Sequence, residues 1–260
     1  TAGGRDPGAA LTRQPDGPVS ASVRDLRASL MLAVSDRPPQ VVLLTGTRAG
    51  EGCSTLALML AQAFSAWDRS VLLIEADTAG RALATRYGGP DRRGILSVLA
   101  GLTPFEDACW RLPGTEVDAL AAEPVTANGA DLFTTGRFAR LIEGLRDRYD
   151  HILIDAPPVL DTADARALAP VCDAVLYVVA ARKTRRTLLR RGLGKLAAVG
   201  RVGAVADERG LEIVGVGVPY GGASHRAVGR TQCVREHCRC ELPELRQQLQ
   251  GVRCVDAGCG

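Results

Sequence analysis

The stretch GTRAGEGCST at residues 46–55 places glycines, a Ser-Thr pair and one cysteine between two apolar segments. Such a loop binds phosphate when successive backbone N–H groups and the N-terminus of the next helix point at the anion. A lysine normally spans the outer phosphates and a Ser/Thr hydroxyl holds Mg²⁺, but here a cysteine stands at the lysine position. The residues predicted to contact a nucleotide are Arg48, Gly50, Glu51, Gly52, Cys53, Ser54 and Thr55.

Carboxylates follow two further apolar runs, at the point where each run ends. LLIEAD ends in Glu75 and Asp77, and HILIDAPP carries Asp155 before two prolines that end the run. Carboxylates at the C-terminal edge of neighbouring strands reach a metal ion and an attacking group. We predict Glu75 and Asp77 as catalytic residues, and Ser54, Asp77 and Asp155 as ligands of Mg²⁺. The alternative, solvated charges at loop entrances, stays open on these residues alone.

The elements that must position these groups are visible as apolar runs separated by helical patterns. Continuous rather than alternating hydrophobicity indicates strands buried on both faces, and intervening helices require crossover connections. The pattern predicts an α/β fold of the doubly wound, P-loop NTPase-like kind, with a mainly parallel sheet and helices on both faces. The predicted strands are 41–45, 70–77, 151–158, 173–181 and 211–218, and the predicted helices are 54–67, 134–147, 162–170 and 184–198.

Composition divides the chain into three parts. Residues 1–18 predict a flexible leader, 19–221 the P-loop domain, and 222–260 a cysteine-rich, disordered tail. A net charge of +3 gives no argument for a nucleic-acid partner, and we expect none. No apolar run approaches the roughly 18 to 20 residues that span a bilayer, so we expect a cytoplasmic domain. The chain begins at Thr1, which leaves an upstream membrane anchor open.

Four segments together resemble the cytoplasmic domain of the bacterial tyrosine kinases that regulate capsule and exopolysaccharide chain length. They are VVLLTGTRAGEGCST, VLLIEAD, GLRDRYDHILIDAPPVLDTADA and VVAARKTRRTLL. VSASVRDLRASL resembles the entry helix of that family and EPVTANGADLF its Asn-Pro-Ala-Glu-Leu segment, so the likeness covers about residues 19–218.

The resemblance implies a deviant P-loop ATPase that binds ATP and Mg²⁺ and phosphorylates tyrosines in its own tail. It implies homo-oligomeric rings at the inner face of the plasma membrane. The implied partner is a membrane polysaccharide co-polymerase or an upstream membrane segment of the same chain. At the matching positions, Gly50, Gly52, Ser54 and Thr55 would contact phosphate and metal, and Asp77 and Asp155 would serve the metal.

The departures from the family pattern fall on the chemistry. They are Cys53 for the lysine, Glu75 for the first aspartate, Ala79 for an arginine, Ala21 for the entry-helix glutamate and Pro219 for an adenine-reading asparagine. No tyrosine follows Tyr220. Losing one charged hydrogen bond to phosphate costs roughly 1.5 to 3 kcal/mol. We therefore expect ATP binding to persist and kinase activity to be weakened or lost.

Two other functions fit the same fold. Arg48 stands where partition-type deviant P-loop ATPases carry a second phosphate-binding lysine, so it is expected to supply part of the missing charge. A non-catalytic pseudokinase that assembles through the helix of Arg24 and Arg27 is the other alternative.

Three further patterns keep two interpretations each. Cys53 is either a redox-sensitive thiol at a helix N-terminus or a small residue in an altered motif. The residues Cys233, His237, Cys238, Cys240, Cys254 and Cys259 are zinc-ligand types at unusual spacing, so they either hold zinc or belong to a disordered or aberrantly translated tail. The basic run Arg182, Lys183, Arg185, Arg186, Arg190 and Arg191 meets either an acidic partner or solvent.

Overall fold

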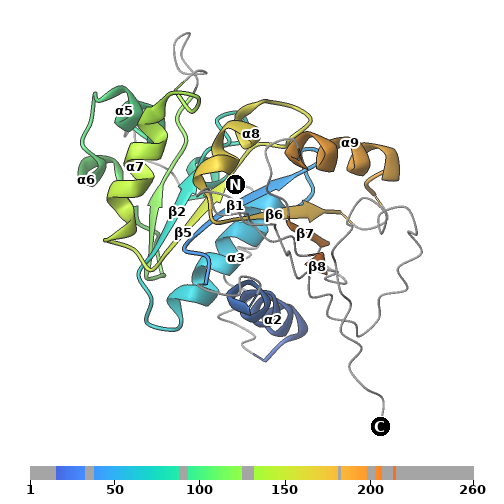
Figure 1. The fold of residues 1–260 in the computed structure, drawn as a ribbon. Coiled ribbons are helices and arrows are strands. Elements are labelled where there is room, and N and C mark those ends of the chain that lie inside the picture. Colours follow the sequence, from blue (N-terminus) through green and yellow to red (C-terminus); the bar gives the residue numbers. More distant parts are fainter. Residues whose placement is uncertain are drawn as a thin grey trace, which may run out of the picture.

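The computed structural model describes residues 16–32, 38–87, 93–124, 132–180, 183–197, 203–206 and 213–214. Its strands form one sheet in the order β3-β4-β2-β5-β1-β6-β7-β8, in which β3 and β8 pair antiparallel and the other strands parallel. Helices cover both faces of this sheet (Figure 1). The predicted doubly wound α/β fold is confirmed.

The strands and helices have the following bounds, given in chain order. The strands are β1 Val41–Gly46, β2 Val71–Glu75, β3 Trp110–Arg111, β4 Val117–Leu120, β5 His151–Asp155, β6 Ala174–Val179, β7 Gly203–Ala206 and β8 Ile213–Val214. The helices are α2 Pro18–Leu32, α3 Cys53–Ser65, α4 Ala82–Tyr87, α5 Ile95–Ala100, α6 Phe105–Ala108, α7 Gly136–Arg146, α8 Asp164–Leu168, the 3₁₀ turn Ala169–Val171, and α9 Arg186–Ala197.

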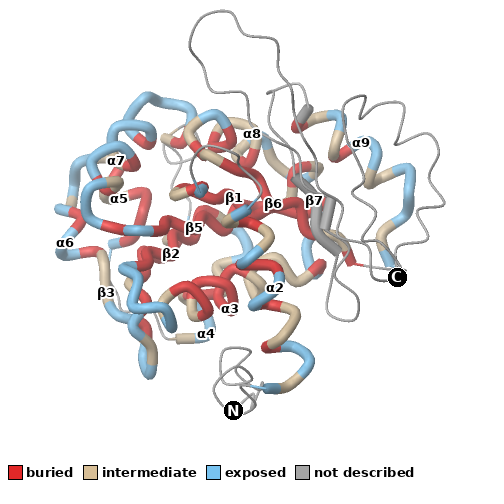
Figure 2. The backbone as a smooth tube through the Cα atoms, turned by 60° about the horizontal axis from the view of Figure 1, so that its bottom comes forward, coloured by how far each residue is buried: buried red, intermediate tan, exposed pale blue. Residues whose placement is uncertain are grey.

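The central strands are apolar throughout because each one contributes to two separate cores. In β1, Val41 and Leu43 pack under α5, α7 and α8, whereas Val42 and Leu44 pack against α2 and α3. Successive side chains of a strand point to opposite faces, so covering both faces buries every residue. All six residues of β1 are buried, and the central strands run as a continuous buried band in Figure 2.

Several elements differ from the sequence-based expectation. The segment between β2 and α7 contains α4, α5, α6, β3 and β4, none of which the sequence analysis predicted. These elements have two to six residues each, too few to show a hydrophobic period. Strand β7 was also missed, and the predicted strand 211–218 is described only at β8.

Parts of the predicted organisation lie outside the described residues. These are residues 1–15 of the predicted leader, the middle of EPVTANGADLF, residues 215–221 of the predicted domain and the whole predicted tail 222–260. Within the described ranges, no helix has the length and hydropathy needed to cross a bilayer.

A charged clamp fixes the start of the central strand. Arg146 of α7 donates two hydrogen bonds to the Asp173 carboxylate, Nη1 to Oδ2 and Nη2 to Oδ1, each at 2.9 Å. Oδ2 also accepts the backbone N–H groups of Gln40 and Val41, at 3.0 and 2.8 Å. Burial opposes ionisation of Asp173, but Arg146 and the backbone donors outweigh it and hold the pKa of this carboxyl below its usual value. The clamp therefore ties α7 and the start of β6 to β1.

We expect Asp173→Asn to lower the free energy of unfolding by about 1.5 to 3 kcal/mol at neutral pH. Because the pKa of Asp173 is lower in the folded state, its contribution is complete above the unfolded pKa of about 4. It disappears as the pH falls through the folded pKa, so the gap between wild type and variant should close in acid. Urea unfolding at several pH values measures this gap. Asp161→Asn, at an exposed position, is the control, and an equal loss there would contradict the assignment.

Candidate functional site

The glycine-rich loop joins the end of the central strand β1 to the first turn of α3. Gly50 and Gly52 have φ angles of 83° and 90°, a left-handed conformation that side chains with a Cβ rarely adopt. Gly52 is the N-cap residue of α3, so this helix begins at Cys53 and directs its N-terminus into the loop. The predicted strand, loop and helix are all present in the structure.

A cavity of about 220 Å³ lies over this loop. Its lining includes all seven predicted nucleotide contacts and the two predicted metal-site carboxylates Asp77 and Asp155. Gly46, Ala49, Gly80, Ala156 and Pro158 complete the wall. The structure therefore brings together nine of the predicted site residues, from three strand ends, and leaves Glu75 outside the lining.

Asp155 ends β5 with its carboxylate unsatisfied. The residue is 2% exposed, and neither carboxylate oxygen accepts a hydrogen bond of ordinary geometry, although Ser54 and Cys53 lie beside it. Burial raises the pKa of Asp155 to about 7 and the charge of Glu75 adds to the rise, against the lowering effect of the neighbouring Ser54 hydroxyl and Cys53 thiol. A buried carboxylate without a partner is costly, and a cation in the cavity would remove that cost.

These residues fit Mg²⁺ better than a metal that requires a complete protein cage. The described residues contain no cluster of three or more His, Cys, Asp or Glu side chains arranged to hold a metal. Magnesium is usually held by one or two carboxylates together with substrate phosphates and water. Ser54 and Asp155 offer one hydroxyl and one carboxylate next to the phosphate loop, which matches that pattern.

Asp77 lies in the turn after β2 and keeps its carboxylate at the cavity. Its Oδ1 accepts the backbone N–H groups of Ala79 and Gly80, at 3.1 and 2.8 Å. A Cβ at Gly80 would lie 2.4 Å from Asp77 Oδ2, so a larger residue there would force the Asp77 carboxylate to move. These two hydrogen bonds hold the Asp77 carboxylate in place through Oδ1. The other oxygen, Oδ2, makes neither of them.

Glu75 has a different environment from the one its sequence position suggested. Its side chain is fully buried and accepts the backbone N–H groups of Leu83 and Ala122, at 2.7 and 3.0 Å. Burial raises its pKa, against the effect of these backbone donors. The carboxylate thus joins β2 to the start of α4 and to the end of β4. Its catalytic role stays a prediction.

Glu51 organises the loop through its side chain. Its Oε2 accepts the N–H groups of Thr47 and Arg48, at 2.6 and 3.2 Å, and Thr184 donates its hydroxyl to Oε1. Tyr177 of β6 donates its hydroxyl to Thr47 Oγ1 at 2.9 Å. The sequence analysis missed Thr47, Tyr177 and Thr184, and no local signal marks a contact across 130 residues or more.

Cys53 brings no positive charge to the cavity. Burial, followed by the charges of Asp155, Asp77 and Glu51, raises the pKa of its thiol well above the usual value. The thiol is therefore neutral at physiological pH, and a neutral thiol is a poor nucleophile. This environment removes the physical basis of the redox hypothesis, which required a lowered pKa.

The side chains that line the cavity include more acids than bases. Among its lining residues only Arg48 is a cation, whereas Glu51, Asp77 and Asp155 are acids. Arg48 is exposed and is one of the loop residues that line the cavity. A phosphate entering without a cation would meet more negative than positive charge, so the arrangement favours a nucleotide bound together with a divalent metal.

Comparisons with known proteins place this chain among P-loop proteins of polysaccharide synthesis and bacterial tyrosine kinases. The model of the cellulose biosynthesis protein BcsQ family matches residues 40–199. The putative tyrosine-protein kinase EpsB of Ralstonia solanacearum is 35% identical over 177 residues, which are 68% of this chain but only 23% of that relative. The tyrosine-protein kinase YwqD of Bacillus subtilis (strain 168) is 31% identical over 167 residues, 64% of this chain and 70% of that relative. The crystal structure of the VpsO kinase domain is 32% identical with a TM-score of 0.64, covering 75% of this chain and 95% of that chain.

Proposed function

Because the chain belongs to the P-loop family of BcsQ-like proteins and bacterial tyrosine-protein kinases, we propose that it binds ATP with Mg²⁺ and regulates exopolysaccharide or capsule production. The observation that carries the proposal is the buried, unpartnered Asp155 carboxylate beside Ser54 and the phosphate loop. Kinase activity is weakened or lost, because no lysine spans the outer phosphates.

The phosphates and the metal of the proposed ligand each have a counterpart in the cavity. The N–H groups around Gly50 and Gly52 and the N-terminus of α3 would receive the phosphates. Ser54 and Asp155 would hold Mg²⁺, and Asp77 would orient a metal-bound water or the attacking group. The metal would supply positive charge to the outer phosphates, part of the charge that a lysine supplies elsewhere in the family.

ATP binding is expected to depend strictly on the divalent cation. Removing Mg²⁺ with a chelator should weaken ATP binding by more than about tenfold, because the cation offsets about two negative charges next to the phosphates. Isothermal titration calorimetry on the reduced full chain, with and without Mg²⁺, measures this. Equal affinity under the two conditions would contradict the proposed metal site. No binding up to about 10 mM ATP would favour the non-catalytic scaffold instead.

One observation favours a second candidate, the partition-type ATPase. Arg48 is exposed and lines the cavity, as expected of a residue that contacts phosphate across a dimer. Light scattering distinguishes the two functions: a partition-type protein dimerises with Mg²⁺ and ATP and loses this response in Arg48→Gln. Self-association of the chain that does not depend on ATP would support the regulator of exopolysaccharide or capsule production instead.

The partners follow from the proposed function. We propose a homo-oligomer at the inner face of the plasma membrane, joined to a polysaccharide co-polymerase or to an upstream membrane segment of the same chain. The much greater length of the Ralstonia relative supports a partner or segment beyond this chain.

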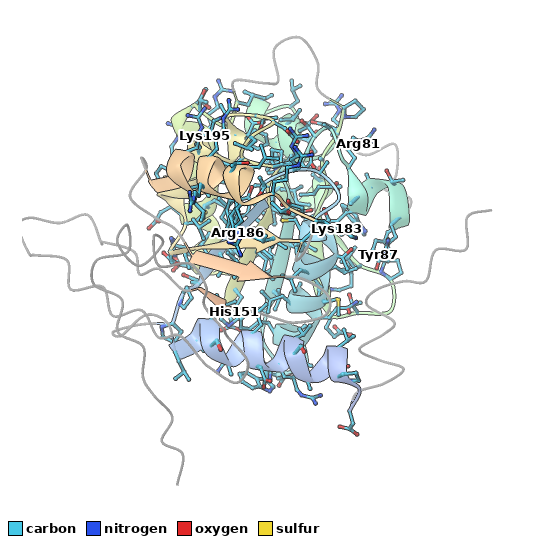
Figure 3. The ribbon with its side chains drawn as sticks, turned by 90° about the vertical axis from the view of Figure 1, so that its right-hand side faces the viewer. Arg81, Tyr87, His151, Lys183, Arg186 and Lys195 are labelled. Atoms are coloured by element: carbon cyan, nitrogen blue, oxygen red, sulfur yellow. The ribbon has the colours of Figure 1, made fainter. Side chains whose placement is uncertain are left out.

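The basic helix α9 carries exposed Arg186 on the side shown in Figure 3, together with Lys183 before the helix and the partly exposed Lys195. Arg182 lies outside the described residues, and no nucleic-acid partner is proposed.

A further inference from the structure

A second, larger cavity lies at the opposite end of α3 from the phosphate loop. Its volume is about 500 Å³, and its walls are α2, the end of α3 and the turn between β3 and β4. Helix α3 has 13 residues and is therefore about 20 Å long, so the two cavities are separate. Figure 1 shows α2 packed beside α3. The size is within the range of small-molecule sites, roughly 300 to 1,000 Å³.

Arg27 of α2 is the central polar group of this pocket. It is only 5% exposed, and its guanidinium lies over the Trp67 ring, 3.3 Å from the ring centroid. Its Nη1 donates to the backbone carbonyl of Ala63, but its Nε is buried without an acceptor. Among the described residues, no carboxylate forms an ion pair with Arg27. A buried cation that keeps an unused N–H donor is a favourable place for an anion to bind, because the anion would accept that hydrogen bond and offset the charge.

A second arginine increases the positive charge at the same place. Arg24 lies one turn before Arg27 and lines the pocket from the same side of α2. Burial and, secondarily, the charge of Arg24 lower the pKa of Arg27. Glu116, the acid in the lining, is turned toward Arg111, with Oε2 2.5 Å from Nη1. The two arginines thus repel each other, and an anion between them would relieve the repulsion.

The remaining lining residues favour a ligand with a flat apolar part. Trp67 is 53% exposed, which is unusual for so large an aromatic side chain, and its ring offers a surface for stacking. Gln62 has a buried side-chain oxygen, Oε1, without a donor, and Ser20 and Thr115 add hydroxyl groups to the wall. A cation from α2 and an aromatic surface and an unused acceptor from the end of α3 therefore face the same pocket.

We propose that this pocket binds a phosphate monoester whose molecule also carries an aromatic ring. The phosphate dianion lies between Arg24 and Arg27 and accepts hydrogen bonds from their guanidinium groups. The ring packs on Trp67 at the end of α3. Two sources share this chemistry, a nucleoside monophosphate and a phosphorylated tyrosine side chain, and both are compared in the test. The proposal does not depend on ATP binding at the phosphate loop.

Intrinsic fluorescence gives a direct readout, because the chain has only two tryptophans, Trp67 and Trp110. In a Trp110→Phe background, Trp67 is the sole tryptophan, and we expect phenyl phosphate to quench it in a saturable way. Inorganic phosphate should bind more weakly because it lacks the ring. Adenosine monophosphate and O-phosphotyrosine are titrated next, and the tighter of the two identifies the source. Excess Mg²⁺ and ATP should leave the quenching unchanged, since α3 separates the two sites.

Two variants separate binding from folding. Arg24→Gln and Arg27→Lys should each weaken phenyl phosphate binding by about tenfold, the loss expected for one charged hydrogen bond. Arg140→Gln, at an exposed position of α7, is the matched control and should have no effect. The melting temperature of each variant is measured alongside, so that a loss of phenyl phosphate binding is separated from a loss of folding. The proposal is overturned if phenyl phosphate causes no saturable change up to about 10 mM, or if Arg140→Gln weakens binding as much as Arg24→Gln.

Discussion

Replacing Cys53 with lysine is expected to raise the affinity for ATP with Mg²⁺ by about ten- to a hundredfold. The substituted side chain would start from the first residue of α3, where the loop presents its N–H groups to the phosphates. It would bring a positive charge into a cavity whose lining has three acids and one arginine. The carboxylates that raise the pKa of the Cys53 thiol would favour the charged form of a lysine at the same position. Hydrolysis of ATP should rise by at least the same factor, because a phosphate-bound lysine stabilises the charge that develops in phosphoryl transfer.

Calorimetry and a steady-state ATPase assay on the same preparations measure both effects. Cys53→Met is the matched control, because methionine is long and flexible but carries no charge. An equal gain with methionine would show that side-chain length rather than charge limits binding. No gain with lysine, in a protein of unchanged stability, would mean that the cavity does not receive the phosphates of a nucleotide.

Replacing Asp155 with asparagine is expected to abolish the dependence of ATP binding on Mg²⁺. This carboxylate is the buried, unpartnered acid that the proposed cation would satisfy. An amide keeps the shape but offers the metal no negative charge, so affinity with Mg²⁺ should fall to about the level without it. Calorimetry with and without the chelator measures the difference. A variant that retains the full response to Mg²⁺ would place the metal elsewhere.

The same variant should leave the ligand-free protein at least as stable as the wild type. In the folded state the pKa of Asp155 is raised to about 7, so ionisation costs stability as the pH rises from the unfolded pKa of about 4 through 7. We expect Asp155→Asn to be more stable than wild type by on the order of 1 kcal/mol above pH 7. The gain should shrink toward pH 5, where Asp155 is protonated in the folded state and no buried charge remains. Urea unfolding at pH 5 and pH 8 tests this, and a variant that is less stable at pH 8 would show that Asp155 has a structural partner.

The groups around the loop were predictable because their signals are local. Gly50 and Gly52 mark backbone positions with positive φ, and the apolar runs before them and before Asp155 mark strands buried on both faces. Once those strands are parallel, their C-terminal ends meet at one edge, which brings Asp77 and Asp155 to the loop. The length of an element also determined whether it could be predicted. The long helices show a hydrophobic period in the sequence, whereas the two- to six-residue elements between β2 and α7 do not.

Side-chain direction and long-range pairing were not encoded in any local pattern. Glu75 and Asp77 are two residues apart and looked equivalent, yet Glu75 is fully buried against the backbone of Leu83 and Ala122, whereas Asp77 faces the cavity. Glu51 was assigned to the nucleotide from its position alone, and only the fold brings Thr184 to its carboxylate.

The fold class, the glycine-rich loop and the loss of its lysine could all be predicted from the sequence. The loop depends on residues within one short segment, and the fold class depends on the order of apolar runs and helical patterns along the chain. Which carboxylate lacks a hydrogen bond of ordinary geometry, and where Arg24, Arg27 and Trp67 form a second pocket, became known only from the folded chain. Those outcomes depend on how sheet order and helix packing bring distant segments together. Burial and the positions of neighbouring charges, which set the cost of each ionised group, exist only after the chain has folded.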